Sequence, residues 1–239
     1  MITFDFSGKV VLVTGVARVG QIGHAVAEAF GRAGAKVVAA DRNAVAVAER
    51  VKEFKAMGID ARPAAGDLTE ADIAALAVET AVKNFGHLDV LVNVAGGLTS
   101  FGPLADTSPD VFDRELSINI KTAYLMCRAS MSELAKSKGC IVNFASAAVL
   151  HPGAGLSVYG AAKGGVAGFT TSLAVELWPH GIRVNAVAPT TVRTSDNVAA
   201  AGDNASFVEI RDIVNAVLFL ASDGSSAITG HLLPVTSGS

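Results

Sequence analysis

The chain has few charged, aromatic or sulfur-containing residues. Of its 239 residues, 17% are charged and 6% are aromatic, and only two are cysteines. Cys127 and Cys140 lie in a predicted helix and at a predicted strand, without the spacing of metal ligands or of a disulfide framework. We therefore expect both to be small core residues. The five histidines are scattered along the chain, which argues against a metal site.

The charge balance and the hydropathy pattern exclude several classes of partner. The net charge is -3 with a pI near 5.9, and no run of lysine and arginine forms the basic stripe that nucleic acid or anionic lipid requires. No stretch approaches eighteen uncharged apolar residues, and Asp5 stands where a signal peptide would be apolar. We expect a soluble, cytoplasmic protein that binds neither nucleic acid nor membrane.

Hydrophobic residues make up 51% of the chain and follow the pattern of an α/β protein. Short valine-rich runs alternate with longer stretches of helical period, which is typical of repeated βαβ units. Seven strands are predicted, at Val10–Thr14, Lys36–Ala40, Ala61–Ala65, Val90–Val94, Ile141–Ala145, Val184–Ala188 and Leu232–Val235. Right-handed crossovers then give a Rossmann-like, doubly wound parallel sheet between two helical layers, in one domain spanning residues 1–239.

The helices are predicted from apolar periodicity. Apolar residues from Ile22 to Ala33 recur at helical spacing, and this helix should end at Gly34. Further helices are predicted at Ala44–Met57, Glu70–Phe85, Pro109–Ser137, Ala161–Trp178 and Val208–Ala221. Sheets of this kind bind ligands at the carboxyl ends of their strands, so functional residues are sought there.

A glycine-rich turn follows the first strand and reads T-G-V-A-R-V-G-Q-I-G from Thr14 to Gly23. Glycine permits a tight turn and a close approach of the backbone. The N-terminus of the next helix offers unpaired N–H groups and a positive dipole end to a pyrophosphate. The order of strand, turn and helix favours a dinucleotide site over a plain connecting loop.

The end of the second strand bears on which dinucleotide is bound. Asp41 lies eighteen residues after Gly23, where an acidic residue accepts hydrogen bonds from the adenosine ribose and repels a 2′-phosphate. NAD is favoured on this ground. Arg18 and Arg42 leave NADP open, because either could pair with a phosphate.

Tyr159 and Lys163, in Y-G-A-A-K, form the candidate catalytic pair. On a helix, this i,i+4 spacing places both side chains on one face. Bringing a tyrosine pKa from about 10 to about 7 requires roughly 4 kcal/mol, which a positive charge at ~4 Å supplies at an effective dielectric of ~20. The tyrosine could then exchange a proton with an alcohol or carbonyl. Taken alone, the pair could also be a core ring beside a solvated amine.

Several motifs in a fixed order resemble the short-chain dehydrogenase/reductase family over essentially the whole chain. Beside the glycine turn they are G-D-L-T at 66–69, N-V-A-G at 93–96, Asn119 within S-I-N, and Ser146 thirteen residues before Tyr159. The resemblance implies hydride transfer between a nicotinamide cofactor and a secondary alcohol or ketone. The implied catalytic residues are Asn119, Ser146, Tyr159 and Lys163. The implied cofactor-binding residues are Gly15, Arg18, Gly20, Ile22, Gly23, Asp41, Arg42, Asp67, Leu68, Asn93, Ala95, Gly96, Tyr159, Lys163, Pro189, Val192 and Thr194.

The resemblance also implies a role for each catalytic residue. Ser146 would bind the substrate oxygen, Tyr159 would transfer the proton, and Lys163 would bind the nicotinamide ribose while lowering the tyrosine pKa. Asn119 would hold a water that links the lysine to solvent. In the cofactor half, Asp67 would bracket the adenine, and the N-V-A-G segment would support the cofactor and the central sheet.

Three features depart from the family pattern. Gly20 and Gly23 follow Gly15 at five and eight residues instead of four and six. This longer turn resembles that of enoyl-acyl carrier protein reductases, which however place six residues between tyrosine and lysine where this chain has three. Thr190 replaces the glycine after Pro189, which predicts a restricted backbone. Only fourteen residues separate Thr194 from Glu209, which predicts a short, mobile substrate lid near residues 195–207.

The loops expected to face the nicotinamide are mostly apolar and favour a neutral or weakly polar secondary alcohol or ketone. They carry Leu98, Phe101, Val149, Leu150, His151 and Leu156. Arg193 could bind a carboxylate or face solvent. A non-catalytic NAD(P)-binding sensor or scaffold and an enoyl-thioester reductase are the alternative functions.

The resemblance implies a homotetramer formed through the long helices after the fourth and fifth strands. Leu125, Phe169 and Leu173 could contribute to such a surface, or could equally belong to the core.

Overall fold

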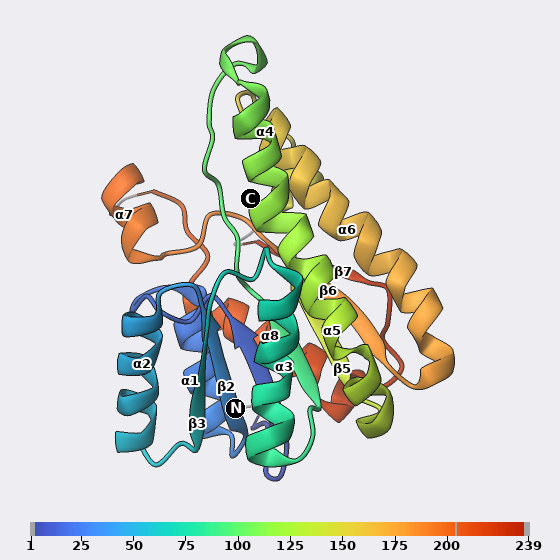
Figure 1. The fold of residues 1–239 in the computed structure, drawn as a ribbon. Helices are drawn as coiled ribbons and strands as arrows, with labels where there is room; N and C mark the ends of the chain where they lie inside the picture. Colours follow the sequence, from blue (N-terminus) through green and yellow to red (C-terminus); the bar gives the residue numbers. More distant parts are fainter. Residues whose placement is uncertain (1–2, 204, 237–239) are drawn as a thin grey trace.

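The structure is a computed structural model that describes residues 3–203 and 205–236 (Figure 1). Seven parallel strands form one sheet in the order β3-β2-β1-β4-β5-β6-β7. Their bounds are β1 Val10–Thr14, β2 Lys36–Asp41, β3 Ala61–Ala65, β4 Val90–Asn93, β5 Cys140–Phe144, β6 Arg183–Pro189 and β7 Leu232–Val235. The strand order reverses between β1 and β4, where doubly wound sheets bind ligands. The predicted Rossmann-like sheet is confirmed.

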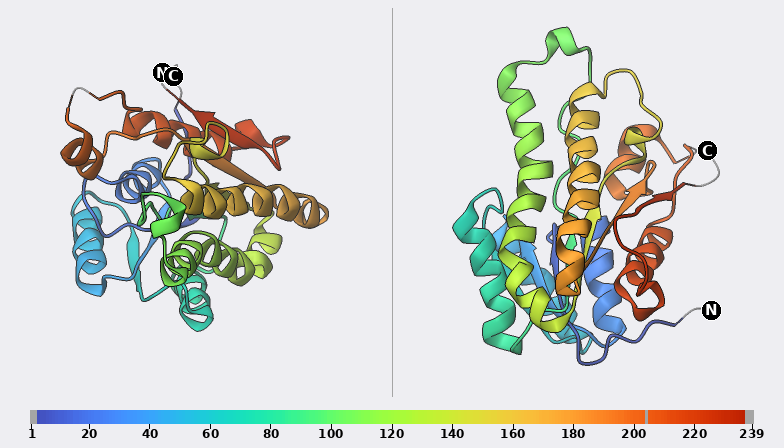
Figure 2. Two further views of the ribbon diagram at one scale, coloured as in Figure 1. Left: turned by 90° about the horizontal axis from the view of Figure 1, so that it is seen from above. Right: turned by 90° about the vertical axis from the view of Figure 1, so that its right-hand side faces the viewer.

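Helices cover both faces of the sheet and give three layers (Figure 2). The core on one face includes residues of α1, α2 and α8, and the core on the other face includes residues of α3, α5 and α6. In the described ranges the helices are α1 Ile22–Arg32, α2 Ala44–Ala56, α3 Ala71–Phe85, α4 Pro109–Leu116, α5 Thr122–Ser137, α6 Ser157–Leu177, α7 Ser195–Ala201 and α8 Ile210–Ala221.

The strands contribute to both cores because successive residues point to opposite faces of the sheet. In β1, Val11 and Val13 lie in the core on the α1 side, whereas Val10 and Leu12 lie in the core on the α3 side. All four are fully buried. Central parallel strands are therefore apolar at every position, which is why valine-rich runs predict them.

The ends of several elements differ from the predicted ones. β2 extends to Asp41, β4 ends at Asn93, β5 begins and ends one residue earlier than predicted, and β6 is one residue longer at each end. α2 ends at Ala56, α3 begins at Ala71 and α8 begins at Ile210. The most important difference is that α6 begins at Ser157 and not at Ala161, so that Tyr159 lies inside the helix that carries Lys163.

The predicted helix Pro109–Ser137 is interrupted by a π turn, Ser117–Lys121, between α4 and α5. A widened turn of this kind is rare and is frequent at functional sites. Ser108 starts α4, because its hydroxyl accepts a hydrogen bond from the Val111 N–H at 3.4 Å. α4 and α6 pack against each other and rise together beyond the sheet (Figures 1 and 2).

The segment after β6 contains a short helix, α7, within the predicted lid. Thr194 caps α7, and its hydroxyl accepts from the Asn197 N–H at 3.3 Å. Arg193 crosses the segment, donating to Asp203 at 2.5 Å and to Glu209 at 2.9 Å. The mobility of this lid stays a prediction.

Some predicted features fall outside the described residues. They are position 204 of the lid, and positions 1–2 and 237–239 of the single domain. Within the described ranges, no helix is long and apolar enough to cross a membrane.

Candidate active site

The glycine-rich turn and the first turn of α1 form one end of the site. A Cβ built on Gly23 would stand 2.1 Å from the carbonyl oxygen of Gly15, so only glycine allows this approach of helix to turn. Gln21 precedes α1 without a side-chain cap, and its amide instead donates to the Ser195 hydroxyl at 2.9 Å. Uncapped N–H groups at a helix N-terminus favour a phosphate, so the turn fits a dinucleotide pyrophosphate. Gly20 and half-buried Ile22 complete the predicted residues of this turn.

Asp41 lies beside the glycine turn at the end of β2. Its carboxylate accepts from the Ala17 N–H and the Asn43 N–H, both at 3.0 Å, which fixes its orientation. Arg18 projects from the turn but donates to Asp196 of α7 at 2.5 Å. Arg42 is exposed next to Asp41. The acidic group of this corner is therefore fixed by the backbone, whereas one of its two arginines already has an acidic partner.

Asp67 and Leu68 follow β3 on the same edge of the sheet. The Asp67 carboxylate accepts from the Thr69 N–H at 3.0 Å and from the Thr69 hydroxyl at 2.8 Å. These hydrogen bonds, and more weakly the Arg42 cation, hold the pKa of Asp67 below its usual range. The Leu68 side chain is buried in the core.

The N-V-A-G segment after β4 joins the sheet to the site. Asn93 is buried and donates to the Asn143 side-chain oxygen at 2.9 Å, so its side chain links β4 to β5 inside the core. The Ala95 N–H donates to the Thr14 hydroxyl at 2.9 Å, which ties the segment to β1. A Cβ on Gly96 would stand 2.5 Å from the side-chain oxygen of Asn119, so glycine is required for Asn119 to approach.

Ser146, Tyr159 and Lys163 lie together after β5. Ser146 follows the strand, and its hydroxyl accepts from the Ala148 N–H at 3.2 Å and hydrogen-bonds to Tyr159. Lys163 is 5% exposed, and its Nζ donates to the Phe144 carbonyl at 2.8 Å and lies 5.9 Å from the centre of the Tyr159 ring. The predicted i,i+4 pair therefore shares one helix face next to a strand-end serine.

The pKa values of Tyr159 and Lys163 differ from the sequence-based expectation. Burial raises the pKa of Tyr159, and the hydrogen bond with Ser146 opposes that effect. Burial also lowers the pKa of Lys163 to about 8. The expected lowering of the phenol pKa assumed that the lysine charge is the largest influence on it; in the folded protein, desolvation of the phenol is larger.

Asn119 sits in the π turn and is 1% exposed. Its side-chain oxygen accepts from the Gly97 N–H and its Nδ2 donates to the Gly97 carbonyl, both at 3.0 Å. The same Nδ2 lies 3.0 Å from the Glu115 backbone carbonyl and 3.3 Å from a Glu115 carboxylate oxygen. The side chain is thus fully engaged in holding the segment after β4.

Two residues of this cluster, Glu115 and Thr99, were not identified from the sequence. Glu115 is fully buried and its carboxylate accepts from the Thr99 N–H at 3.1 Å and from the Thr99 hydroxyl. Glu115 lies four residues before Asn119, the spacing that singled out Tyr159 and Lys163. The available signal was a glutamate on the apolar face of α4.

The residues after β6 close the other side of the site. Pro189 ends the buried strand, and Val192 and Thr194 are buried beyond it. The carbonyl of Val192 accepts from the Asn197 side chain at 2.8 Å and from the Thr194 N–H at 2.7 Å. Within the described residues, Lys138 is the only non-glycine residue with a positive φ, so Thr190 imposes no strain at the position of the missing glycine.

Exposed apolar side chains lie on the loops above the sheet edge. Leu98 is 48% exposed, Phe101 73% and Leu150 43%, and His151 is also exposed. The Gly102 N–H donates to the Gly155 carbonyl at 3.0 Å, which joins the loop after β4 to the loop after β5. Arg193 is paired with two carboxylates and stacks on Phe207 at 4.8 Å. A substrate carboxylate would have to compete with Asp203 and Glu209 for this guanidinium.

The two cysteines and the proposed surface leucines belong to the core. Burial raises the pKa of Cys127 to about 12 and that of Cys140 to about 11. Leu125 and Leu173 are 7% and 6% exposed and pack in the core on the α3 side. Phe169 packs against that core and meets Tyr124 edge to face at 6.1 Å. In the described parts of the chain, no three His, Cys, Asp or Glu residues cluster as metal ligands would.

Comparison with known proteins identifies this arrangement. The family model of the short chain dehydrogenases matches residues 9–205. Xanthoxin dehydrogenase of Arabidopsis thaliana is 36% identical, over 97% of this chain and 89% of its own. The 1,6-dihydroxycyclohexa-2,4-diene-1-carboxylate dehydrogenase of Acinetobacter baylyi is also 36% identical, over 99% and 98%.

A solved structure gives the same result. The structure of 7α-hydroxysteroid dehydrogenase complexed with NADH and 7-oxo glycochenodeoxycholic acid superposes with a TM-score of 0.92 at 27% identity, covering 99% of this chain and 96% of its own. The chain belongs to the short-chain dehydrogenase family of oxidoreductases, which bind a nicotinamide cofactor.

Proposed function

We propose that the protein is an NAD-dependent oxidoreductase that interconverts a secondary alcohol and a ketone, with Tyr159 as the general acid/base. The observation that carries this proposal is the meeting of Ser146, Tyr159 and buried Lys163 at the sheet edge that also holds the glycine turn. A proton-transfer group beside a dinucleotide site is the arrangement that hydride transfer to or from an alcohol carbon requires.

The cofactor would be held by residues whose positions fit its parts. The glycine turn and the N-terminus of α1 would bind the pyrophosphate, Asp41 the adenosine ribose, and Lys163 the nicotinamide ribose. When bound, the nicotinamide supplies or accepts the hydride. Ser146 would orient the substrate oxygen toward the Tyr159 phenol, and Asn119 would hold the π turn beside them.

The pKa of Tyr159 suggests which direction is favoured at neutral pH. Burial raises this pKa, so the phenol is protonated at neutral pH and can donate its proton to a ketone oxygen. The reverse reaction needs the phenolate. We therefore expect alcohol oxidation to accelerate as the pH rises, whereas ketone reduction proceeds at neutral pH.

Replacing Tyr159 with phenylalanine tests the mechanism, and Tyr124 provides a matched control because the chain has only two tyrosines. Tyr159→Phe should lose turnover of any accepted alcohol or ketone by about a hundredfold or more while keeping its Kd for NADH. Tyr124→Phe, on the surface of α5, should behave as wild type. Full activity in Tyr159→Phe would exclude the proposed mechanism.

The same assays separate the alternative functions. A wild-type protein that binds NADH but turns over no substrate would be a sensor or scaffold. Consumption of NADH with a 2-enoyl thioester and none with ketones would indicate an enoyl reductase.

The proposed preference for NAD rests on Asp41 and on the pairing of Arg18 with Asp196. A fixed carboxylate repels a 2′-phosphate, and an arginine that already has an acidic partner attracts it less. Titration should give a lower Kd for NADH than for NADPH. Asp41→Asn should weaken NADH binding and narrow that difference, and equal affinities in the wild-type protein would refute the preference.

The proposed substrate is neutral and largely apolar. Leu98, Phe101 and Leu150 are exposed at the site, whereas the nearby Arg193 is engaged by Asp203 and Glu209. Uncharged alicyclic or aryl ketones should therefore be accepted in preference to phosphorylated or carboxylated ones. A panel of both kinds, compared by kcat/KM, checks this.

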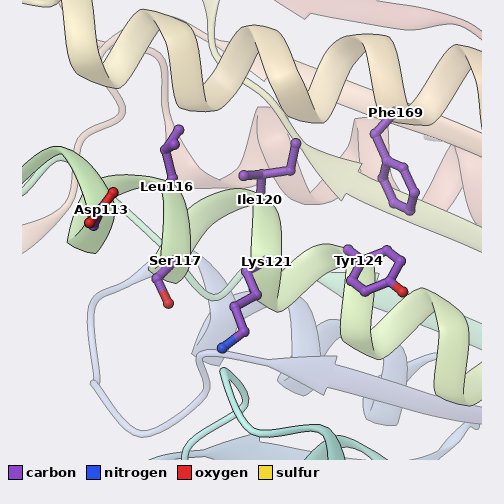
Figure 3. Close-up of a pocket in the computed structure, with 7 residues that line it drawn as sticks. All are labelled: Asp113, Leu116, Ser117, Ile120, Lys121, Tyr124 and Phe169. Atoms are coloured by element: carbon purple, nitrogen blue, oxygen red, sulfur yellow. The ribbon is translucent and has the colours of Figure 1, made fainter.

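The homotetramer implied by the family resemblance also stays a proposal. A groove of about 400 Å³ runs along the π turn and α6, and Leu116, Ile120 and Phe169 line it together with Tyr124 (Figure 3). Figure 3 shows Leu116 and Ile120 extending toward α6 and Phe169 reaching down from α6. Light scattering should give four subunits for the wild type and fewer for Tyr124→Asp.

The cytoplasmic location of the protein is likewise a prediction.

A further inference from the structure

A buried carboxylate adjoins the catalytic cluster and has no role in the proposed mechanism. Glu115, near the end of α4, is 0% exposed. Three donors converge on its carboxylate: the Thr99 N–H at 3.1 Å, the Thr99 hydroxyl, and Asn119 Nδ2 at 3.3 Å. Both oxygens of a carboxyl group accept hydrogen bonds, and here three donors from two different segments converge on one such group.

The contacts of Glu115 connect two parts of the site. Thr99 belongs to the loop after β4, and Asn119 lies in the π turn and hydrogen-bonds to Gly97 of the same loop. Removing the carboxylate would leave the Thr99 donors and the Asn119 amide without this partner. Placing a charge in the interior costs free energy, which the three hydrogen bonds offset, and these bonds hold the loop and the π turn in one arrangement.

We propose that Glu115 is a positioning residue of this active site, which clamps the Gly97–Thr99 loop to the π turn that carries Asn119. This inference rests on the proposed function for its kinetic consequences but not for the clamp itself. Thr99 is the second member of the clamp, since both of its donors bind the same carboxylate.

The charge of Glu115 gives the clamp a signature that a neutral structural contact would lack. Glu115 raises the pKa of both Tyr159 and Lys163, after the larger effects of burial. The other elements packed here add no further charge: residues 94–105 of the loop after β4 and residues 141–149 of β5 and its following turn contain no titratable side chain. Lys121 of the π turn instead lowers the pKa of Asp67.

The test uses Glu115→Gln, which keeps the size and removes the charge, and Glu115→Asp, which keeps the charge and shortens the reach. In alcohol oxidation, Glu115→Gln should lower kcat about tenfold and move the acid limb of kcat/KM to lower pH, because the Tyr159 pKa falls when the neighbouring charge is removed. Glu115→Asp should have a lower kcat than the wild type but the same acid limb of kcat/KM. Asp110→Asn, an exposed charge on the same helix, is the control and should leave both unchanged.

The proposal would be overturned if Glu115→Gln had the same kcat as the wild type and the same acid limb of kcat/KM. The clamp is also tested without turnover, by a double-mutant cycle of Glu115→Met, which removes the acceptor oxygens, and Thr99→Val on urea unfolding. The two changes should be coupled by about tenfold in the unfolding equilibrium constant, and additive effects would overturn the clamp. If Glu115→Met does not fold, Glu115→Gln replaces it in the cycle. Should the wild type turn over no alcohol or ketone, the proposed function fails and the cycle still decides on Glu115.

Discussion

Lys163 should make the stability of the protein depend on pH in a way that Lys163→Met removes. The lysine is 5% exposed, and burial lowers its pKa from 10.5 to about 8. Between these two values the unfolded chain binds more protons than the folded protein, so stability rises with pH across this window. As the pH falls through about 8, the folded protein loses the stability that it gains from a neutral Lys163. The difference between the two pKa values corresponds to about 3 kcal/mol.

The assay is the free energy of urea unfolding for both proteins from about pH 7 to about pH 10.5. Other titrating groups are common to both and cancel in the difference. Near neutral pH the two proteins should be similar, because methionine avoids the buried charge but loses the hydrogen bond to Phe144, which contributes about 1.5–3 kcal/mol. As the pH rises, the wild type should gain about 3 kcal/mol relative to Lys163→Met.

An exposed lysine serves as the control for this experiment. Lys52 is exposed on α2, and Lys52→Met should show no such pH-dependent difference. If the difference between the wild type and Lys163→Met is constant over the whole range, the lysine is not desolvated as its burial indicates. Lys163 would then be hydrated in the folded protein.

Further predictions concern the glycine turn and the cysteines. Gly23→Ala should destabilise the protein by about 1–3 kcal/mol or more and abolish NADH binding, because its Cβ would overlap the Gly15 carbonyl at 2.1 Å. Gly168→Ala, where a Cβ meets no atom within 4 Å, should instead stabilise α6 by about 0.5–1 kcal/mol; equal stabilities of the two variants in urea unfolding would refute this reasoning. Cys127 and Cys140 should react with a thiol reagent only when the protein unfolds, since both are buried and burial raises both pKa values. Fast labelling of either one in the folded protein would contradict their placement.

Local sequence determined the fold and the position of the site. The strands could be predicted because central parallel strands are buried on both faces and therefore read as valine-rich runs. The glycine turn could be predicted because strand, turn and helix adjoin in the chain. Tyr159 and Lys163 needed only the i,i+4 geometry of one helix, although the predicted start of that helix was four residues too late.

The tertiary structure decided what the residues of the site do to one another. The pKa of Tyr159 depends on how far the packed protein excludes water, which no spacing reveals, and burial raises this pKa where the spacing of Tyr159 and Lys163 predicted a lowering. Leu125 and Leu173 proved to be core residues because α5 and α6 turn those positions toward the sheet.

The role of Asn93 and the existence of the Glu115 clamp depend on the same cause. Asn93 meets Asn143 only because β4 and β5 are neighbours in the sheet, and Glu115 meets Thr99 only because the loop after β4 folds back onto α4. Apolar periodicity and motif spacing record which groups lie close along one element. Desolvation and contacts between elements arise only when the chain has packed, so they are set by the three-dimensional structure.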